Sequence, residues 1–268
     1  MTFKTAIQLY SVRDTFESDP LGCLKALKKM GYDGIELCGW SGIDPSWMRG
    51  ACDAIGLEIV SIHISVWGMS EYPHDFAEKA VALGMSYAVI PYLSSETDFP
   101  GQKNFAATEK EMMKVSKELS AKHIQLLYHN HGAEFEEKNK ICGEYLYDLL
   151  MNAFTPDVLQ CEIDTCWAHN MGVDPAEHIL KYKGRIPALH LKDYILKGRG
   201  KDKIFTTCPF GDGRVNALEV IRAAKKAGTK WLIVEEDRPY PETKTELDCA
   251  RKSINNIKKL IAEAEQQK

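Results

Sequence analysis

The stretch Leu159-Gln-Cys-Glu-Ile-Asp164-Thr-Cys-Trp167 contains a short apolar run that ends at a carboxylate. The segment Gly172-Val-Asp174-Pro175-Ala-Glu177 follows, and it has the signature of a helix start: Asp174 at the N-cap and Pro175 at the first helical position. The pattern predicts a strand over 159–163 and then a helix. Asp164 is therefore expected at the carboxyl end of a strand.

Three other apolar runs also end in an acid or an imidazole. They are Ile124-Gln-Leu-Leu-Tyr128-His129-Asn130-His131, Ile186-Pro-Ala-Leu-His190-Leu-Lys192-Asp193 and Trp231-Leu-Ile-Val-Glu235-Glu236-Asp237-Arg238. If these four strands are parallel neighbours, their carboxyl ends meet at one edge and bring the polar groups together.

The rest of the chain repeats the same alternation of strand and helix. Earlier strands are expected over 6–10, 34–38, 57–64 and 87–91, and helices over 20–30, 44–55, 73–83, 102–121, 145–151, 174–182, 217–227 and 243–264. Strands that alternate with helices indicate a parallel sheet with right-handed crossovers, and about eight units favour closure into a barrel. The absence of Gly-x-Gly-x-x-Gly after the first strand disfavours an open dinucleotide-binding sheet. We predict an α/β fold, a (β/α)8 TIM barrel, as a single domain over residues 1–268.

Composition and charge narrow the class of protein. The chain has 268 residues, 44% hydrophobic and 27% charged, with a formal charge of -4 and a pI near 6.1. No global positive field is available to attract a polyanion, so no nucleic-acid partner is expected. Eight cysteines without a Cys-x-x-Cys pair indicate reduced thiols. No apolar run approaches the length of a membrane span, and we expect a cytoplasmic protein with no membrane partner.

The segment between 192 and 214 is expected to be one loop. It is rich in basic residues, which most often form a solvated face. Gly211-Asp-Gly213 in the same segment precedes an expected helix, whose N-terminus could accept a phosphate; the same glycines could instead permit a tight loop. The basic residues are Lys192, Lys197, Arg199, Lys201, Lys203 and Arg214.

Three consecutive strands supply the candidate metal ligands. Asp164, His190 and Glu235 end the expected sixth, seventh and eighth strands. Clustered ionisable groups are costly unless something neutralises them, and a divalent cation does so. A mixture of carboxylates with one imidazole suits one divalent metal ion, Mn, Mg, Co or Zn. A lone histidine in an apolar run, such as His190, is otherwise more often part of the core.

Taken together, these motifs resemble those of the xylose isomerase-like family of barrels. That family includes sugar and sugar-phosphate isomerases and epimerases, inosose dehydratases and, more distantly, apurinic-site endonucleases of the endonuclease IV type. The resemblance covers nearly the whole chain. The residues that carry it are Tyr128-His-Asn-His131 with Glu134-Phe135, Glu162-Ile-Asp164-Thr165, Leu189-His-Leu-Lys-Asp193, Gly211-Asp-Gly213 and Val234-Glu-Glu-Asp-Arg238.

The resemblance implies one divalent ion held by two glutamates, an aspartate and a histidine. Asp164, His190 and Glu235 match three of these positions. At the fourth, at the end of the expected fifth strand, many members have a glutamate, whereas this chain has His129. Either His129 is the fourth ligand, or the following loop folds back and Glu134 supplies the carboxylate. We favour Glu134, because three carboxylates with one imidazole keep the charge balance of a hard-cation site.

The resemblance also implies the remaining roles. For an isomerase or epimerase, proton transfer next to a carbonyl would use Glu235 and Glu134 as flanking carboxylates. Lys192 would stabilise developing negative charge, and His131 would act as a relay acid or hydrogen-bond donor. The residues expected to contact a sugar are Glu36, His63, His129, Trp167 and Arg238.

The leading hypothesis is a metal-dependent isomerase or epimerase of a sugar, keto-sugar or sugar phosphate, acting through a metal-stabilised enediolate. The first alternative is a lyase or dehydratase on a 3-keto-glycoside or inosose, which would use the same metal site. Apurinic-site cleavage is less favoured because of the acidic charge balance, and a non-catalytic sugar-binding barrel is the remaining alternative. By analogy with such barrels a homo-oligomer is compatible with the sequence, which does not specify one.

Overall fold

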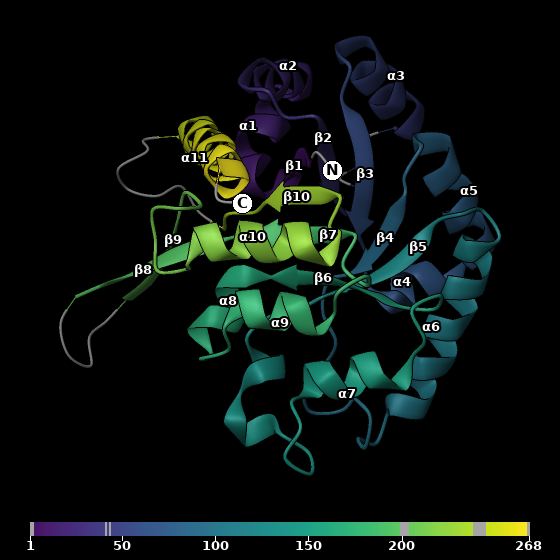
Figure 1. Cartoon of the computed structure of the whole chain (residues 1–268). Coiled ribbons are helices and arrows are strands. Elements are labelled where there is room, and N and C mark those ends of the chain that lie inside the picture. Colours follow the sequence, from purple (N-terminus) through teal and green to yellow (C-terminus); the bar gives the residue numbers. More distant parts are fainter. Residues whose placement is uncertain (1–2, 41, 43, 199–203, 238–244, 267–268) are drawn as a thin grey trace.

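Eight parallel strands close into a barrel in the computed structural model, which describes residues 3–40, 42, 44–198, 204–237 and 245–266 (Figure 1). Each strand pairs with its neighbours in chain order, and the last pairs with the first: Lys4 lies opposite Trp231 and Ile7 opposite Val234. The predicted (β/α)8 barrel is confirmed. The strands are β1 (Lys4–Gln8), β2 (Gly34–Cys38), β3 (Glu58–His63), β4 (Tyr87–Ile90), β5 (Gln125–His129), β6 (Gln160–Asp164), β7 (Ala188–Leu191) and β10 (Trp231–Val234).

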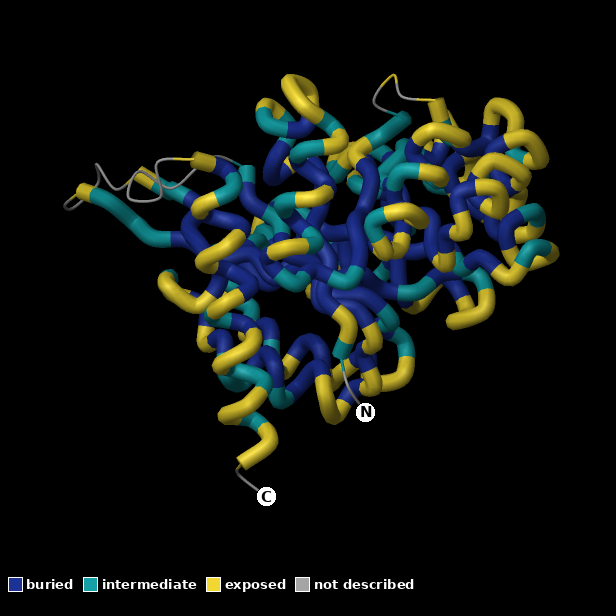
Figure 2. The backbone as a smooth tube through the Cα atoms, turned by 90° about the horizontal axis from the view of Figure 1, so that it is seen from above, coloured by how far each residue is buried: buried dark blue, intermediate teal, exposed yellow. Residues whose placement is uncertain are grey.

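Helices surround the barrel and bury one face each against the strands (Figures 1 and 2). Four of them end where the sequence places a glycine, and these glycines, Gly31, Gly56, Gly84 and Gly228, have φ of +98°, +80°, +70° and +84°. Glycine adopts this left-handed conformation at little cost, so it ends the helix and starts the turn to the next strand. The helices are α2 (Pro20–Met30), α3 (Pro45–Ile55), α5 (Pro73–Leu83), α6 (Phe105–Ser120), α7 (Leu146–Ala153), α9 (Pro175–Lys181), α10 (Ala217–Ala227) and α11 (Glu246–Gln266).

Several short elements at the carboxyl ends of the strands were not predicted. The most relevant to function is a helix that begins directly after Asp164, ahead of the helix start predicted at Asp174. These elements are the 3-10 helices η1 (Leu9–Val12), η2 (Ala133–Phe135) and η3 (Glu137–Asn139) and the helices α1 (Arg13–Ser18), α4 (Val66–Glu71) and α8 (Thr165–Asn170). Within the described residues, no helix is both long enough and apolar enough to cross a membrane.

The barrel interior changes from apolar to polar along the strands. Side chains alternate across a strand, so every second residue points inward. The amino-terminal half of the interior is an apolar cluster that includes Ala6, Val89, Leu127, Ala188 and Ile233. The next inward positions on the same strands carry ionisable and polar groups, and these build the site described below. A separate and larger apolar core lies between the strands and the helices.

The segment expected as one loop after β7 contains an antiparallel hairpin, β8 (Asp193–Lys197) with β9 (Ile204–Cys208). Arg199, Lys201 and Lys203 lie outside the described residues. The Asp193 carboxylate accepts hydrogen bonds from the backbone N–H groups of Tyr194 (2.8 Å), Gly211 (3.1 Å), Gly213 (2.9 Å) and Val215 (3.0 Å). The amides considered for a phosphate therefore bind a carboxylate of the chain itself. A Cβ at Gly213 would lie 2.1 Å from Asp193 Oδ1, so glycine is required there.

We predict that Asp193→Ala lowers the free energy of unfolding by about 2–6 kcal/mol, because the two buried N–H groups, those of Tyr194 and Val215, would each lose their acceptor at a cost of about 1–3 kcal/mol. Urea unfolding followed by circular dichroism measures the loss. Asp174→Ala is the matched control: Asp174 caps α9 at an exposed position, and its loss should cost about 1 kcal/mol. Equal losses in the two variants would contradict the structural role of Asp193.

Candidate metal centre

The three predicted ligands converge at the carboxyl ends of β6, β7 and β10. Asp164 lies opposite His190 in the β6–β7 register, and His190 Nδ1 lies 3.0 Å from Glu235 Oε2. Four residues each place one ligand atom within 4.8 Å of the others: His129, Asp164, His190 and Glu235. The structure thus brings together Asp164, His190 and Glu235, and it adds His129 from the end of β5.

Glu134 lies elsewhere. Its carboxylate accepts a hydrogen bond from the Tyr128 hydroxyl (2.6 Å) and from the backbone N–H of His131 (3.1 Å to each oxygen). These bonds hold Glu134 within its own loop, and burial raises the pKa of its carboxyl group. Glu134 belongs to neither group of prospective ligands among the described residues. Of the two candidates for the fourth position, His129 is therefore the one that faces the other three.

The donor atoms fit a cation. Asp164 Oδ1 accepts the backbone N–H of Trp167 at 2.9 Å and caps α8, whereas Asp164 Oδ2 is buried without a hydrogen-bond partner among the described residues. Burial raises the pKa of Asp164 to about 7. A buried carboxylate oxygen without a partner is costly, and a divalent ion would remove that cost. Burial also lowers the pKa of His129 well below its usual value, which leaves the neutral imidazole that a metal requires.

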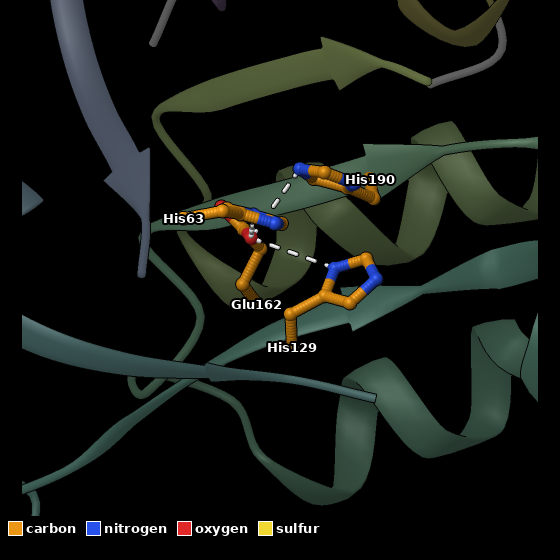
Figure 3. A group of neighbouring side chains, drawn as sticks. All are labelled: His63, His129, Glu162 and His190. Carbon is orange, nitrogen blue, oxygen red and sulfur yellow. Dashed lines mark hydrogen bonds and ion pairs between the residues drawn. The ribbon is translucent and has the colours of Figure 1, made fainter. Parts of the chain in front are cut away.

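A second group of polar side chains lies next to these ligands, inside the barrel. Figure 3 shows it around Glu162, whose Oε2 lies 2.9 Å from His63 Nε2, 3.3 Å from His190 Nε2 and 3.5 Å from His129 Nδ1. Glu162 Oε1 has no hydrogen-bond partner among the described residues. Glu162 points inward because it lies two residues before Asp164 on the same strand face. The spacing of two residues from Asp164 could have identified Glu162 as an inward-facing residue, but Glu162 was not predicted as a site residue.

Glu36 belongs to this inner group and not to the open part of the site. It is fully buried; Gln8 Nε2 donates to its Oε1 (2.9 Å) and Ser61 Oγ to its Oε2 (2.6 Å). Glu36 Oε1 also lies 2.7 Å from His190 Nε2. The expectation that Glu36 contacts a sugar does not fit this position. A carboxylate on the far nitrogen of a metal-binding imidazole fixes the ring, so Glu36 orients His190 toward Glu235.

In the metal-free protein the inner group keeps its charge balance through protonated imidazoles, and binding of a metal ion by His190 would release the proton of that ring. Burial lowers the pKa of His63, but Glu36 and Glu162 outweigh burial and raise it to about 10. The same two carboxylates, together with Glu235, raise the pKa of His190 well above its usual value. His63 is nearly buried and paired with these acids, so it faces them more than the open site.

Lys192 and Trp167 form the wall on the β7 side. Lys192 Nζ lies 2.8 Å from Asp237 Oδ1, 3.4 Å from Glu235 Oε2 and 4.9 Å from the centre of the Trp167 ring. Burial lowers the pKa of Lys192, but the neighbouring carboxylates outweigh it and keep the ammonium charged. Burial lowers the pKa of His131 to about 4, so this imidazole is neutral beside Trp167. Arg238 lies outside the described residues.

We predict that Asp164→Asn abolishes stoichiometric binding of a divalent ion, whereas Glu134→Gln retains it. The reason is that Asp164 offers an unpartnered oxygen to the cluster, while both Glu134 oxygens are bound within their loop. Elemental analysis after dialysis against manganese measures the content, with Asp174→Asn as a control for the change of charge. Loss of the ion in Glu134→Gln would restore Glu134 as the fourth ligand.

We also predict that the metal-free protein loses stability as the pH rises from about 7 to about 10. His63 has a folded pKa of about 10 against an ordinary value of 6.5, so its contribution is complete below the ordinary value and disappears as the pH passes the folded one. His63→Asn removes this group and should flatten the dependence. Urea unfolding of both proteins across this range provides the comparison, and parallel curves would contradict the charged His63.

Comparisons with known proteins agree with the fold. The family described as xylose isomerase-like TIM barrel matches residues 24–260. An inosose dehydratase of Geobacillus kaustophilus (strain HTA426) is 24% identical over 256 residues, covering 80% of this chain and 79% of that protein.

Solved structures are similar over almost the whole chain. A sugar phosphate isomerase/epimerase from Parabacteroides distasonis ATCC 8503 has a TM-score of 0.80 and 22% identity, covering 98% of this chain and 96% of that one. The IOLI protein with a bound zinc atom has a TM-score of 0.69 and 16% identity, covering 98% and 99%. The resemblance predicted from the sequence is thereby confirmed.

Proposed function

We propose that this chain, which belongs to the family of xylose isomerase-like TIM barrels, is a metal-dependent enzyme that removes a proton next to the carbonyl group of a keto-sugar or inosose and then eliminates water. We assign one divalent ion to His129, Asp164, His190 and Glu235. Two imidazoles with two carboxylates favour zinc, cobalt or manganese over magnesium. The zinc in the IOLI protein supports this assignment.

The position of Lys192 carries the proposal. Its ammonium group lies 3.4 Å from Glu235 Oε2, so a charged acid and a carboxylate lie side by side at the site. An epimerase that works with two carboxylates needs a second one on the opposite side of the substrate. Glu134, which was expected there, is bound to Tyr128 and His131 within its own loop. The groups that remain are Glu235 as a base and Lys192 as an acid, and an elimination requires one base and one acid.

A bound divalent ion supplies a Lewis acid for the substrate carbonyl oxygen and acidifies the neighbouring C–H bond. Glu235 takes that proton. The electron pair left on carbon forms the new double bond, and the C–O bond on the next carbon breaks. Lys192 donates a proton to the departing hydroxyl, so that water leaves. Asp237 holds the ammonium group at 2.8 Å, and we assign the neutral ring of His131, next to Trp167, to a hydroxyl group of the substrate.

The substrate assigned here is a neutral sugar. The backbone amides at Gly211 and Gly213 were the candidate phosphate site, and they bind Asp193 instead. The relative named inosose dehydratase supports a neutral polyhydroxy ketone. Isomerisation or epimerisation is the second candidate, because the neutral imidazole of His131 could act as the second base in place of Glu134.

We predict that the manganese-loaded protein converts an inosose or 3-keto-glucose to a product lighter by one water. Lys192→Met should reduce this conversion about 10²–10⁴-fold, the usual contribution of a general acid, while exchange of the substrate hydrogen with deuterated water persists. Glu235→Gln should abolish both. Mass spectrometry and proton NMR follow the two processes, and Lys183→Met, at an exposed lysine, is the control. A product of unchanged mass would identify an isomerase or epimerase instead.

A further inference from the structure

The hairpin of β8 and β9 leaves the barrel directly after β7 and projects away from it (Figure 1). Its strands pair from Asp193 opposite Cys208 to Lys197 opposite Ile204. The proposed chemistry uses Lys192, immediately before the hairpin, but none of its strand residues. Ile204 at the start of β9 is 66% exposed.

Aromatic rings connect the hairpin to the metal centre. The Phe205 ring stacks on Trp167 with centroids 5.4 Å apart and planes within 11°, and it lies 4.9 Å from the Tyr194 ring at 23°. The Tyr194 hydroxyl bonds to His169 Nδ1 at 3.0 Å. Trp167 and His169 belong to α8, which Asp164 caps. The base of the hairpin is therefore held against the helix that follows a prospective metal ligand.

A cavity of about 390 Å³ lies beside this stack, between the hairpin, α8 and the segment after β10. This volume is within the range of sites for small molecules. The cavity reaches Asp237, whose carboxylate binds the Lys192 ammonium group, so it lies beside the acid of the proposed reaction. Its lining residues are Trp167, Ile204, Phe205, Thr206, Thr207 and Asp237.

We propose that this cavity is a subsite for a second ring attached to the reacting sugar, so that the substrate is a keto-glycoside. Glu235 takes the proton next to the carbonyl group, the glycosidic C–O bond on the next carbon breaks, and Lys192 protonates the departing oxygen, so the alcohol or phenol of the second ring leaves in place of water. The inference rests on the proposed function, because it takes the sugar to be bound at the metal centre.

The ring has apolar faces and a hydroxylated edge, which describes a phenolic ring or a second sugar. Trp167, Ile204 and Phe205 provide the apolar walls, and Thr206 and Asp237 provide the hydrogen-bonding groups.

Charge argues against a phosphate or other anion in the same cavity. Lys192 is the cation at its edge among the described residues, and Glu235 and Asp237 already pair with it. The Asp237 side chain is 34% exposed at the cavity, where it would repel an anion and accept a hydrogen bond from a hydroxyl group. The ring would thus be neutral.

Equilibrium binding to the manganese-loaded protein tests the subsite without turnover. Isothermal titration would compare phenyl β-D-glucopyranoside and cellobiose with methyl β-D-glucopyranoside, which lacks a second ring. We expect one of the first two to bind about tenfold more tightly than the methyl glycoside, and which one does so identifies the ring. Phe205→Ala should remove this gain and leave the affinity for the methyl glycoside unchanged.

Ile204→Asp is the second variant, because Ile204 is exposed and its replacement does not disturb the core. Tyr72→Ala, at a 65% exposed aromatic residue of another loop, should keep the full gain. The subsite is refuted if neither two-ring ligand binds more tightly, or if the gain survives in both hairpin variants. A gain in binding without any loss of water from a keto-sugar would retain the subsite and refute the proposed reaction. Loss of water from a keto-sugar without a gain in binding would retain the proposed reaction and refute the subsite.

Discussion

The pairing of buried carboxylates with imidazoles inside the barrel is the constraint on which the site depends. Glu36 and Glu162 are fully buried, and each lies within hydrogen-bonding distance of a histidine ring nitrogen. Removing one partner of such a pair leaves an uncompensated charge, which is strongly destabilising. The inner group therefore fixes the ring of His190, and through it the position of Glu235. The candidate metal ligands at the strand ends thus lie on a buried polar layer.

Much of this arrangement follows from strand periodicity. Apolar runs that end in an acid or imidazole were sufficient to predict eight strands and the convergence of Asp164, His190 and Glu235. The prediction succeeds because the carboxyl ends of parallel strands meet at one face of a barrel. Glu162 could have been found by the same rule, since it shares a strand face with Asp164.

The loops were less predictable, because their conformation depends on contacts distant in sequence. The Tyr128 hydroxyl and a backbone N–H set the position of Glu134. Glu134 was favoured over His129 on the charge balance of the site alone, which takes no account of these two hydrogen bonds. The hairpin was expected to be a loop because the segment between its strands is rich in basic residues, and the pairing of β8 with β9 is not visible as a sequence pattern. The turn at Gly211 and Gly213 shows the same limit. The sequence indicated that it could bind an anion, and it does so, but the anion is the carboxylate of Asp193 in the same chain.

Lys192 contacts the prospective ligand Glu235 and directly precedes the hairpin of β8 and β9. It is 2% exposed, and it contacts Glu235 on one side, Asp237 on another and the Trp167 ring on a third. A buried ammonium group is tolerated here because two carboxylates compensate for its lost hydration. A group that leaves from the substrate next to Lys192 would enter the space bounded by Trp167 and the hairpin. In the proposed reaction, the contacts that keep this lysine charged also place its ammonium group between the residues assigned to the metal ion and the cavity assigned to the departing ring.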